Sequence, residues 1–215
     1  MPRIACLHTF DSNAAVFEEA LRATGLAGVS LQHTVRADLL AAAEREGRLT
    51  SDIAEETVAV LRGLSAQADA VLLTCSTLGP AAEAAAPDSP VPVLRVDAAL
   101  AAEAVKAGGR VVVLCAVETT VEPTRHLFEA AARATGAAVS VEVVPQAWAA
   151  FKAGDPERYR ELVARAAGAA KAAGATRVAL AQASMAGAAA LLPETERPLT
   201  SPTVGLAAAV AASRG

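Results

Sequence analysis

Short apolar runs alternate with longer segments of helical periodicity along the whole chain. Residues 4–7 form the first apolar run, and residues 11–23 then place Val16, Ala20 and Leu21 on one face of a predicted helix. Further strands are expected at residues 29–33, 71–74, 91–96, 110–114 and 178–181, with helices at 38–46, 51–65 and 80–86. Alternating strands and helices of these lengths predict an α/β fold with parallel sheets.

The second half of the chain repeats the pattern of the first. Residues 110–114 align with residues 3–7 when 107 is added, and the same shift places Gly47 on Gly154 and Cys75 on Gln182. We therefore expect two pseudo-symmetric Rossmann-like halves, each a mostly parallel four-stranded sheet flanked by helices. The first half would comprise residues 1–97 and 205–215, and the second residues 98–204. Because ligands bind beyond the carboxyl ends of parallel strands, the active site is expected in the cleft between the halves.

Composition narrows the classes of partner. The chain has 215 residues and a formal net charge of −4, which gives no basic surface for nucleic acid. No apolar run is long enough for a membrane span, and the three cysteines are widely separated, as in a reducing cytoplasm. The three histidines show no metal-binding spacing, so we expect neither a metal nor another cofactor.

Cys75-Ser76-Thr77 carries the strongest chemical signal, because it follows a buried apolar run and precedes a predicted helix. A thiol at that point lies near free backbone N–H groups and the positive end of a helix dipole, and both favour the thiolate. The same N–H groups can hold a carboxylate or a phosphate. Other polar residues that follow predicted strands are His8, Thr9, Thr119, Thr120, Gln182 and Ser184.

Most of these residues also have an ordinary structural interpretation. His8 is about as well explained by a hydrogen-bonded structural histidine as by a catalytic one. Thr119 and Thr120 could cap the helix that follows them, and Gln182 and Ser184 could satisfy a turn. The remaining cysteines, Cys6 and Cys115, lie in apolar strands, where a free cysteine usually behaves as a small buried hydrophobe.

The repeat and the Cys75-Ser76-Thr77 motif together resemble the aspartate/glutamate/hydantoin racemase superfamily, whose relatives include maleate isomerase and arylmalonate decarboxylase. Residues 180–185, Leu-Ala-Gln-Ala-Ser-Met, are similar to a bacterial Asp/Glu racemase branch. The resemblance implies cofactor-independent proton transfer at the carbon next to the carboxylate of a small amino or organic acid. It implies Cys75 as acid/base or nucleophile, Ser76 and Thr77 as carboxylate ligands, and Thr119 and Thr120 as the second set of hydroxyls. Homodimers are common in the superfamily.

One position departs from the superfamily pattern. Its second cysteine, expected near residue 182, is replaced by Gln182, with Ser184 two residues later. Neither glutamine nor an unactivated serine exchanges protons near neutral pH. Three chemistries remain. The first is one-base chemistry with Cys75 alone, such as decarboxylation followed by protonation. The second is covalent attack by Cys75 with Gln182 or Ser184 stabilising the intermediate, and the third is racemisation with His8 or His33 as the second base. A non-catalytic carboxylate-binding protein is the alternative from another class.

Overall fold

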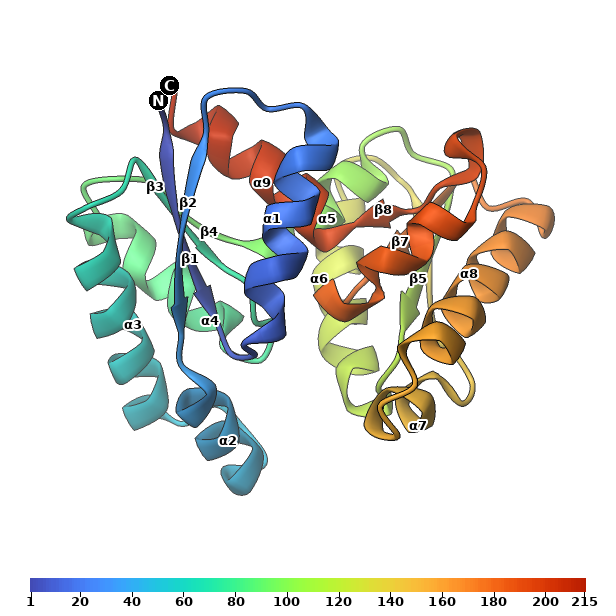
Figure 1. The fold of residues 1–215 in the computed structure, drawn as a ribbon, viewed down its shortest axis with the longest axis horizontal. Helices are drawn as coiled ribbons and strands as arrows, with labels where there is room; N and C mark the ends of the chain where they lie inside the picture. Colours follow the sequence, from blue (N-terminus) through green and yellow to red (C-terminus); the bar gives the residue numbers. More distant parts are fainter. The chain divides into compact units, whose positions relative to one another are not determined.

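The computed structural model describes residues 1–215 and contains two four-stranded parallel sheets (Figure 1). The strand orders are β2-β1-β3-β4 and β6-β5-β7-β8. Contacts divide the chain into one unit of Met1–Ala99 with Pro202–Gly215 and a second unit of Leu100–Ser201. The predicted α/β class, with two parallel four-stranded sheets flanked by helices, is confirmed.

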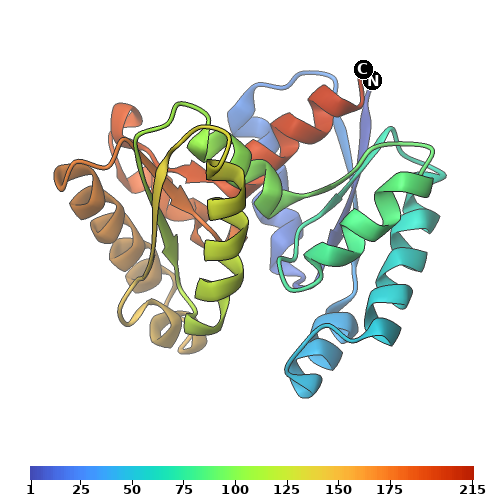
Figure 2. The same cartoon turned by 180° about the vertical axis from the view of Figure 1, so that it is seen from behind.

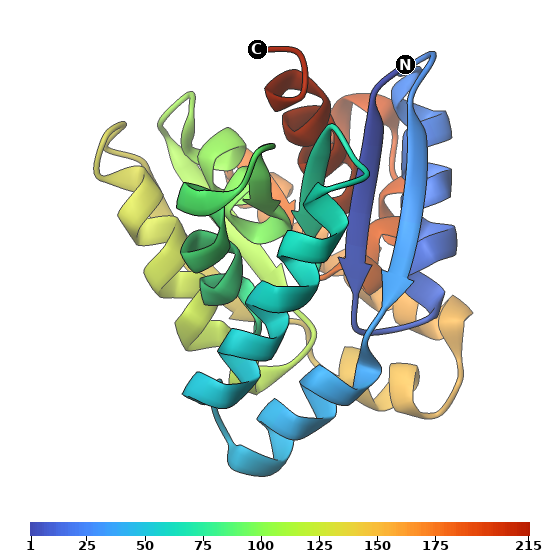
Figure 3. The ribbon, with the colours of Figure 1, turned by 90° about the vertical axis from the view of Figure 1, so that its left-hand side faces the viewer.

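The first sheet is covered by helices on both faces (Figure 3). Its unit contains β1 (Arg3–His8), α1 (Ser12–Thr24), β2 (Ser30–Val35), α2 (Ala37–Glu46), α3 (Ser51–Ser65), β3 (Ala70–Leu73), α4 (Gly79–Ala85), a short 3-10 turn (Ala86–Asp88), β4 (Val93–Arg95) and most of α9 (Ser201–Ala212). Side chains alternate along a strand, so Ala5 and Leu7 of β1 join the core with α3, whereas His8 packs against Phe17 of α1. The two faces of β1 therefore have different chemical surroundings.

The second unit has the same succession of elements (Figure 2). It contains β5 (Arg110–Cys115), a 3-10 turn (Glu118–Thr120), α6 (Val121–Ala132), β6 (Ala138–Val143), α7 (Ala147–Lys152), α8 (Pro156–Ala172), β7 (Arg177–Leu180), two 3-10 segments (Ala183–Leu191 and Glu194–Glu196) and β8 (Leu199–Thr200). The division between the units falls inside α5 (Val96–Val105). Val112 and Leu114 of β5 pack against Val163 and Ala167 of α8 in one apolar core. No helix has the length and apolar character that crossing a membrane requires.

The repeat extends to individual backbone contacts. Thr74 N–H donates to the Leu7 carbonyl at 3.0 Å, and Ala181 N–H, 107 residues later, donates to the Leu114 carbonyl at 3.0 Å. One predicted strand is wrong in length: only Val93–Arg95 of the expected 91–96 is extended, because Val96 already begins α5.

Candidate active site

Cys75 lies just beyond the carboxyl end of β3 and is buried. The hydroxyls of Thr9 and Thr77 and the backbone N–H groups of Thr77 and Leu78 face its sulfur as donors that favour the thiolate. Thr74 N–H donates to the Leu7 carbonyl, which holds the ends of β1 and β3 together and brings Thr9 to the thiol. The predicted cluster of Cys75, Thr9 and Thr77 is therefore assembled within the first unit.

The resting state of this thiol differs from the sequence-based expectation. Burial raises the pKa of Cys75, and the hydrogen bonds from Thr9, Leu78 and Thr77 oppose this effect without cancelling it. The helix that follows, α4, has only seven residues. Loss of hydration therefore outweighs the favourable polar contacts, and Cys75 rests as a neutral thiol whose anion, once formed, has four hydrogen bonds ready.

The turn after Cys75 leaves two hydroxyl groups accessible. Ser76 is half-buried and Thr77 is exposed. Gly79 opens α4, and a Cβ atom there would collide with the guanidinium of Arg95. Arg95 itself is held by Asp97, with Nε and Nη2 each donating at 2.8 Å, and by Glu83, to which Nη1 donates at 2.6 Å. The guanidinium next to the turn is thus paired with two carboxylates.

Gln182 occupies the position in the second unit that corresponds to Cys75. Its Oε1 accepts from Ala116 N–H at 2.7 Å, and its Nε2 donates to Thr120 Oγ1 at 3.0 Å. Thr120 Oγ1 in turn donates to the Val117 carbonyl at 2.6 Å. Ala116 corresponds to Thr9 under the shift of 107, so the same pair of loops is joined in both units. In the second unit the Gln182 amide joins the two loops. An amide does not exchange protons near neutral pH, so this position supplies no acid or base.

Ser184 corresponds to Thr77 and has a partner that the sequence did not reveal. Its Oγ lies 2.9 Å from the hydroxyl of Tyr159 in α8. Burial raises the pKa of Tyr159 to about 12, and the hydrogen bond with Ser184 acts in the opposite direction. Tyr159 is the only tyrosine of the chain, but its distance in sequence from Ser184 hid the pairing. Thr119 is exposed at the end of β5, whereas Thr120 is bonded to Gln182.

His8 is directed away from the thiol. Cys75 packs with Ala5 and Leu7 on one face of the sheet, whereas His8 lies fully buried on the α1 face. Its Nδ1 is 2.8 Å from Thr74 Oγ1 and its Nε2 is 2.8 Å from His33 Nδ1. Burial lowers the pKa of His8 to about 4, with a smaller contribution from His33. The structure does not bring either histidine to Cys75.

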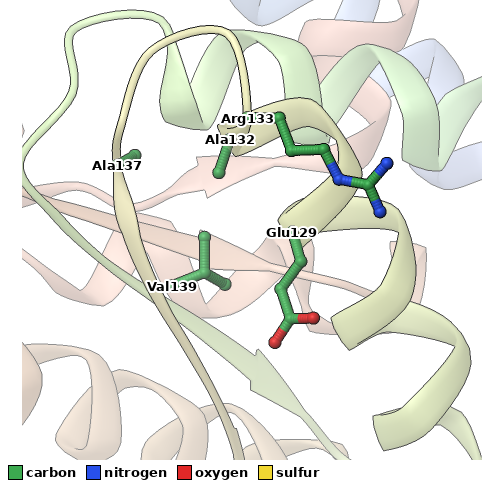
Figure 4. Close-up of a pocket in the computed structure, with 5 residues that line it drawn as sticks. All are labelled: Glu129, Ala132, Arg133, Ala137 and Val139. Atoms are coloured by element: carbon green, nitrogen blue, oxygen red, sulfur yellow. The ribbon is translucent and has the colours of Figure 1, made fainter.

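Two surface hollows lie apart from all of these residues. The one in Figure 4, of about 300 Å³, lies between the end of α6 and the start of β6 and is lined by Glu129, Ala132, Arg133, Ala137 and Val139. A second, of about 440 Å³, involves α2 and the start of α3. Neither contains any of the site residues that the sequence predicts, so neither is assigned to chemistry.

Comparison with known proteins places the chain in a family. The model of the Asp/Glu/hydantoin racemase family matches residues 9–212. Aspartate racemase from Picrophilus torridus has a similar structure, with a TM-score of 0.74, 14% identity, and 100% of this chain and 95% of that chain covered. Allantoin racemase from Pseudomonas fluorescens has a TM-score of 0.67 and 20% identity, with 99% and 91% covered.

A third similar structure is maleate isomerase from Pseudomonas putida S16, with a TM-score of 0.60, 15% identity, and 96% of this chain and 90% of that chain covered. The comparison with curated protein sequences gave no significant match. These structures share the two-sheet fold, and the family model spans almost the whole chain. The chain therefore belongs to the Asp/Glu/hydantoin racemase family, and its enzyme class is isomerase.

Proposed function

We propose that this protein is a cofactor-independent isomerase that transfers a proton at the carbon next to the carboxylate of a small amino or organic acid. Cys75 is the acid/base, and the observation that carries the proposal is the set of hydrogen bonds at its sulfur. Family membership and the three free cysteines agree with a thiol-based enzyme of a reducing cytoplasm.

In the forward step, the Cys75 thiol first releases its proton to solvent. The thiolate then takes the proton from the carbon, and the electron pair of the C–H bond moves into the carboxylate. The resulting enediolate has gained negative charge on its oxygens, which the hydroxyls of Ser76 and Thr77 can stabilise by hydrogen bonds. The thiol formed on Cys75 is the stable resting state, because burial raises its pKa. Return of the proton from Cys75 to the same face restores the substrate, whereas delivery of a proton from solvent to the opposite face of the planar enediolate inverts the carbon and leaves the first proton on Cys75.

We further propose that Thr119, Thr120, Gln182 and Ser184 form a set of substrate-binding residues in the second unit. Gln182 is a positioning residue here, since its amide already holds Ala116 and Thr120. Ser184 with Tyr159 provides a hydroxyl pair for a second polar group of the substrate. Both histidines are paired on the α1 face of the sheet, whereas Cys75 packs with Ala5 and Leu7 on the opposite face, so neither histidine is proposed as a second base.

A decarboxylase-like lyase is the second candidate, and the resting protonation of Cys75 favours it. Loss of carbon dioxide would leave the electron pair of the broken C–C bond in an enolate. The Cys75 thiol would then donate its proton to that carbon, and the thiolate would regain a proton from solvent. This chemistry needs a single acid and makes no demand on Gln182.

The test is a substrate panel that distinguishes the two reactions. The names of similar structures suggest both enantiomers of aspartate and glutamate, together with allantoin and maleate, and an arylmalonate tests the lyase. Chiral chromatography that shows inversion without carbon dioxide release supports the isomerase, whereas stoichiometric carbon dioxide release supports the lyase. Binding of these acids without any turnover contradicts both and supports a carboxylate-binding protein.

A further inference from the structure

Three potential metal ligands meet beneath α1, on the face of the first sheet that does not carry Cys75. Cys6 and His8 are two residues apart on β1 and therefore point to the same face. His33 of β2 lies opposite Cys6 in the parallel register. The cysteine sulfur and the histidine ring nitrogens all lie within 4.8 Å of one another. None of the three takes part in the proposed proton transfer.

The outer hydrogen bonds fix which ring nitrogens carry protons. Thr74 Oγ1 donates to the Leu7 carbonyl at 3.0 Å, so it accepts from His8 Nδ1 at 2.8 Å. His33 Nε2 donates to the Glu18 carboxylate at 3.3 Å. A neutral imidazole has one N–H, which leaves lone pairs on His8 Nε2 and His33 Nδ1. With both rings neutral, these two nitrogens face each other at 2.8 Å and repel unless a proton or a metal cation lies between them.

The charges around the cluster match a divalent cation. A thiolate on Cys6 and the Glu18 carboxylate together contribute two negative charges, so a doubly charged ion gives a neutral assembly. Neutrality matters because Cys6 and His8 are fully buried, and buried charge is costly unless it is paired.

The donor set selects the type of metal. One sulfur and two imidazole nitrogens are typical ligands of zinc, and Thr74 and Glu18 supply the outer partners that orient ligating histidines. A tetrahedral zinc site separates two nitrogens by about 3.3 Å, so the rings must part by about half an ångström. His33 lies on the edge strand with 19% of its side chain exposed, which permits this movement and gives the ion an entry path.

We propose that Cys6, His8 and His33 form a binding site for one divalent transition-metal cation of the zinc type, with solvent in the fourth position. The ion would join β1 to β2 and, through Glu18, to α1. Its function would be to stabilise the first unit, since the cluster is separate from Cys75.

Cobalt(II) is a direct probe, because thiolate coordination gives it a near-ultraviolet charge-transfer band that other ligands do not. The full-length protein, stripped with a chelator, is titrated with cobalt chloride, and zinc chloride is then added to displace the ion. We expect one equivalent of cobalt with the thiolate band, displacement by zinc, and a higher unfolding temperature with zinc. The variant Glu18→Gln keeps an acceptor for His33 Nε2 but removes the negative charge, and should weaken zinc binding about 10- to 100-fold.

His33→Gln removes a half-buried ligand at the sheet edge and should abolish the band. The matched controls are His126→Gln and Cys115→Ala, which change the other histidine and another buried thiol and should keep the band. If the Cys6→Ser variant, which lacks the proposed sulfur ligand, does not fold, the cobalt spectrum of the wild-type protein still decides whether a thiolate binds the ion. No thiolate band at one equivalent of cobalt, or a band that survives His33→Gln, overturns the proposal. Because no turnover is measured, the result is independent of the proposed isomerase activity.

Discussion

At the scale of the residue, Cys75 combines two opposed influences. Its burial favours the neutral thiol, while the hydroxyls of Thr9 and Thr77 and two backbone N–H groups favour the thiolate. A group of this kind holds a proton tightly at rest yet has partners in place for its anion. Such an environment suits a residue that must both take and return a proton.

The alkylation rate of Cys75 reports this balance. Because its pKa is raised, the thiolate fraction and the rate with iodoacetamide should keep rising with pH beyond 9.0, where an ordinary thiol levels off. Thr9→Val removes a hydrogen bond to the anion and should slow alkylation at neutral pH about tenfold, the equivalent of roughly 1.4 kcal/mol.

Peptide mapping by mass spectrometry identifies the alkylated cysteine. Thr57→Val is the matched control, since it removes another buried hydroxyl, one that donates to the Ile53 carbonyl in α3. An equal change of the Cys75 rate in both variants would show that general loosening, rather than the Thr9 hydrogen bond, controls the thiol.

Gln182 has a structural role that can be measured separately. Gln182→Ala leaves the buried Ala116 N–H without an acceptor, so the free energy of unfolding should fall by about 1–3 kcal/mol. Gln67→Ala, at an exposed position, should change it by less than about 0.5 kcal/mol. Urea unfolding of both variants makes the comparison, and equal stabilities would contradict the assigned hydrogen bonds.

At the scale of the element, close packing in the first unit depends on small residues. A Cβ atom at Gly205 of α9 would lie 2.5 Å from Val96 Cγ2 at the start of α5. The helix can therefore approach β3 and α5 this closely only because position 205 has no side chain. Alanine-rich helices of this kind replace the large aromatic cores that the composition excludes.

Two glycine-to-alanine changes test this packing. Gly205→Ala should destabilise the protein by about 1–3 kcal/mol, because overpacking exceeds the gain in helix propensity. Gly63→Ala in α3 meets nothing within 4 Å and should stabilise it by about 0.5–1 kcal/mol. Thermal unfolding of the two variants should shift in opposite directions, and shifts of the same sign would count against the packing.

Most elements could be predicted from local sequence signals. Gly47 and Gly154 have φ angles of 66° and 70° and end equivalent helices, as the repeat indicated. The Cys75 turn was found because a polar motif follows an apolar run. The pairing of His8 with His33 was not, since it depends on the register of β1 with β2, and the rise in the Cys75 pKa depends on burial.

At the scale of the whole molecule, the repeat explains why one chain carries two similar polar turns of different chemistry. Cys75 and Gln182 have equivalent positions and each joins the same pair of loops in its own unit. Duplicated architecture therefore preserves the contact while the chemical group differs. The difference between Cys75 and Gln182 distinguishes an isomerase with one thiol in each unit from an enzyme with a thiol in only one unit.

A homodimer remains a prediction from the family resemblance. Light scattering coupled to size-exclusion chromatography measures it directly. We expect a mass of about twice the 21.6 kDa of one chain. A mass of one chain at micromolar concentration would contradict that expectation and leave the assignment of Cys75 unaffected.

The central claim is that Cys75 moves a proton at the carbon next to the substrate carboxylate. Its most direct measurement is the incorporation of deuterium at that carbon in deuterated water, followed by NMR with the substrate identified by the panel. We expect incorporation with the wild type and with Cys115→Ala, and a loss of at least about 1000-fold with Cys75→Ala. Undiminished incorporation in folded Cys75→Ala protein would contradict the account.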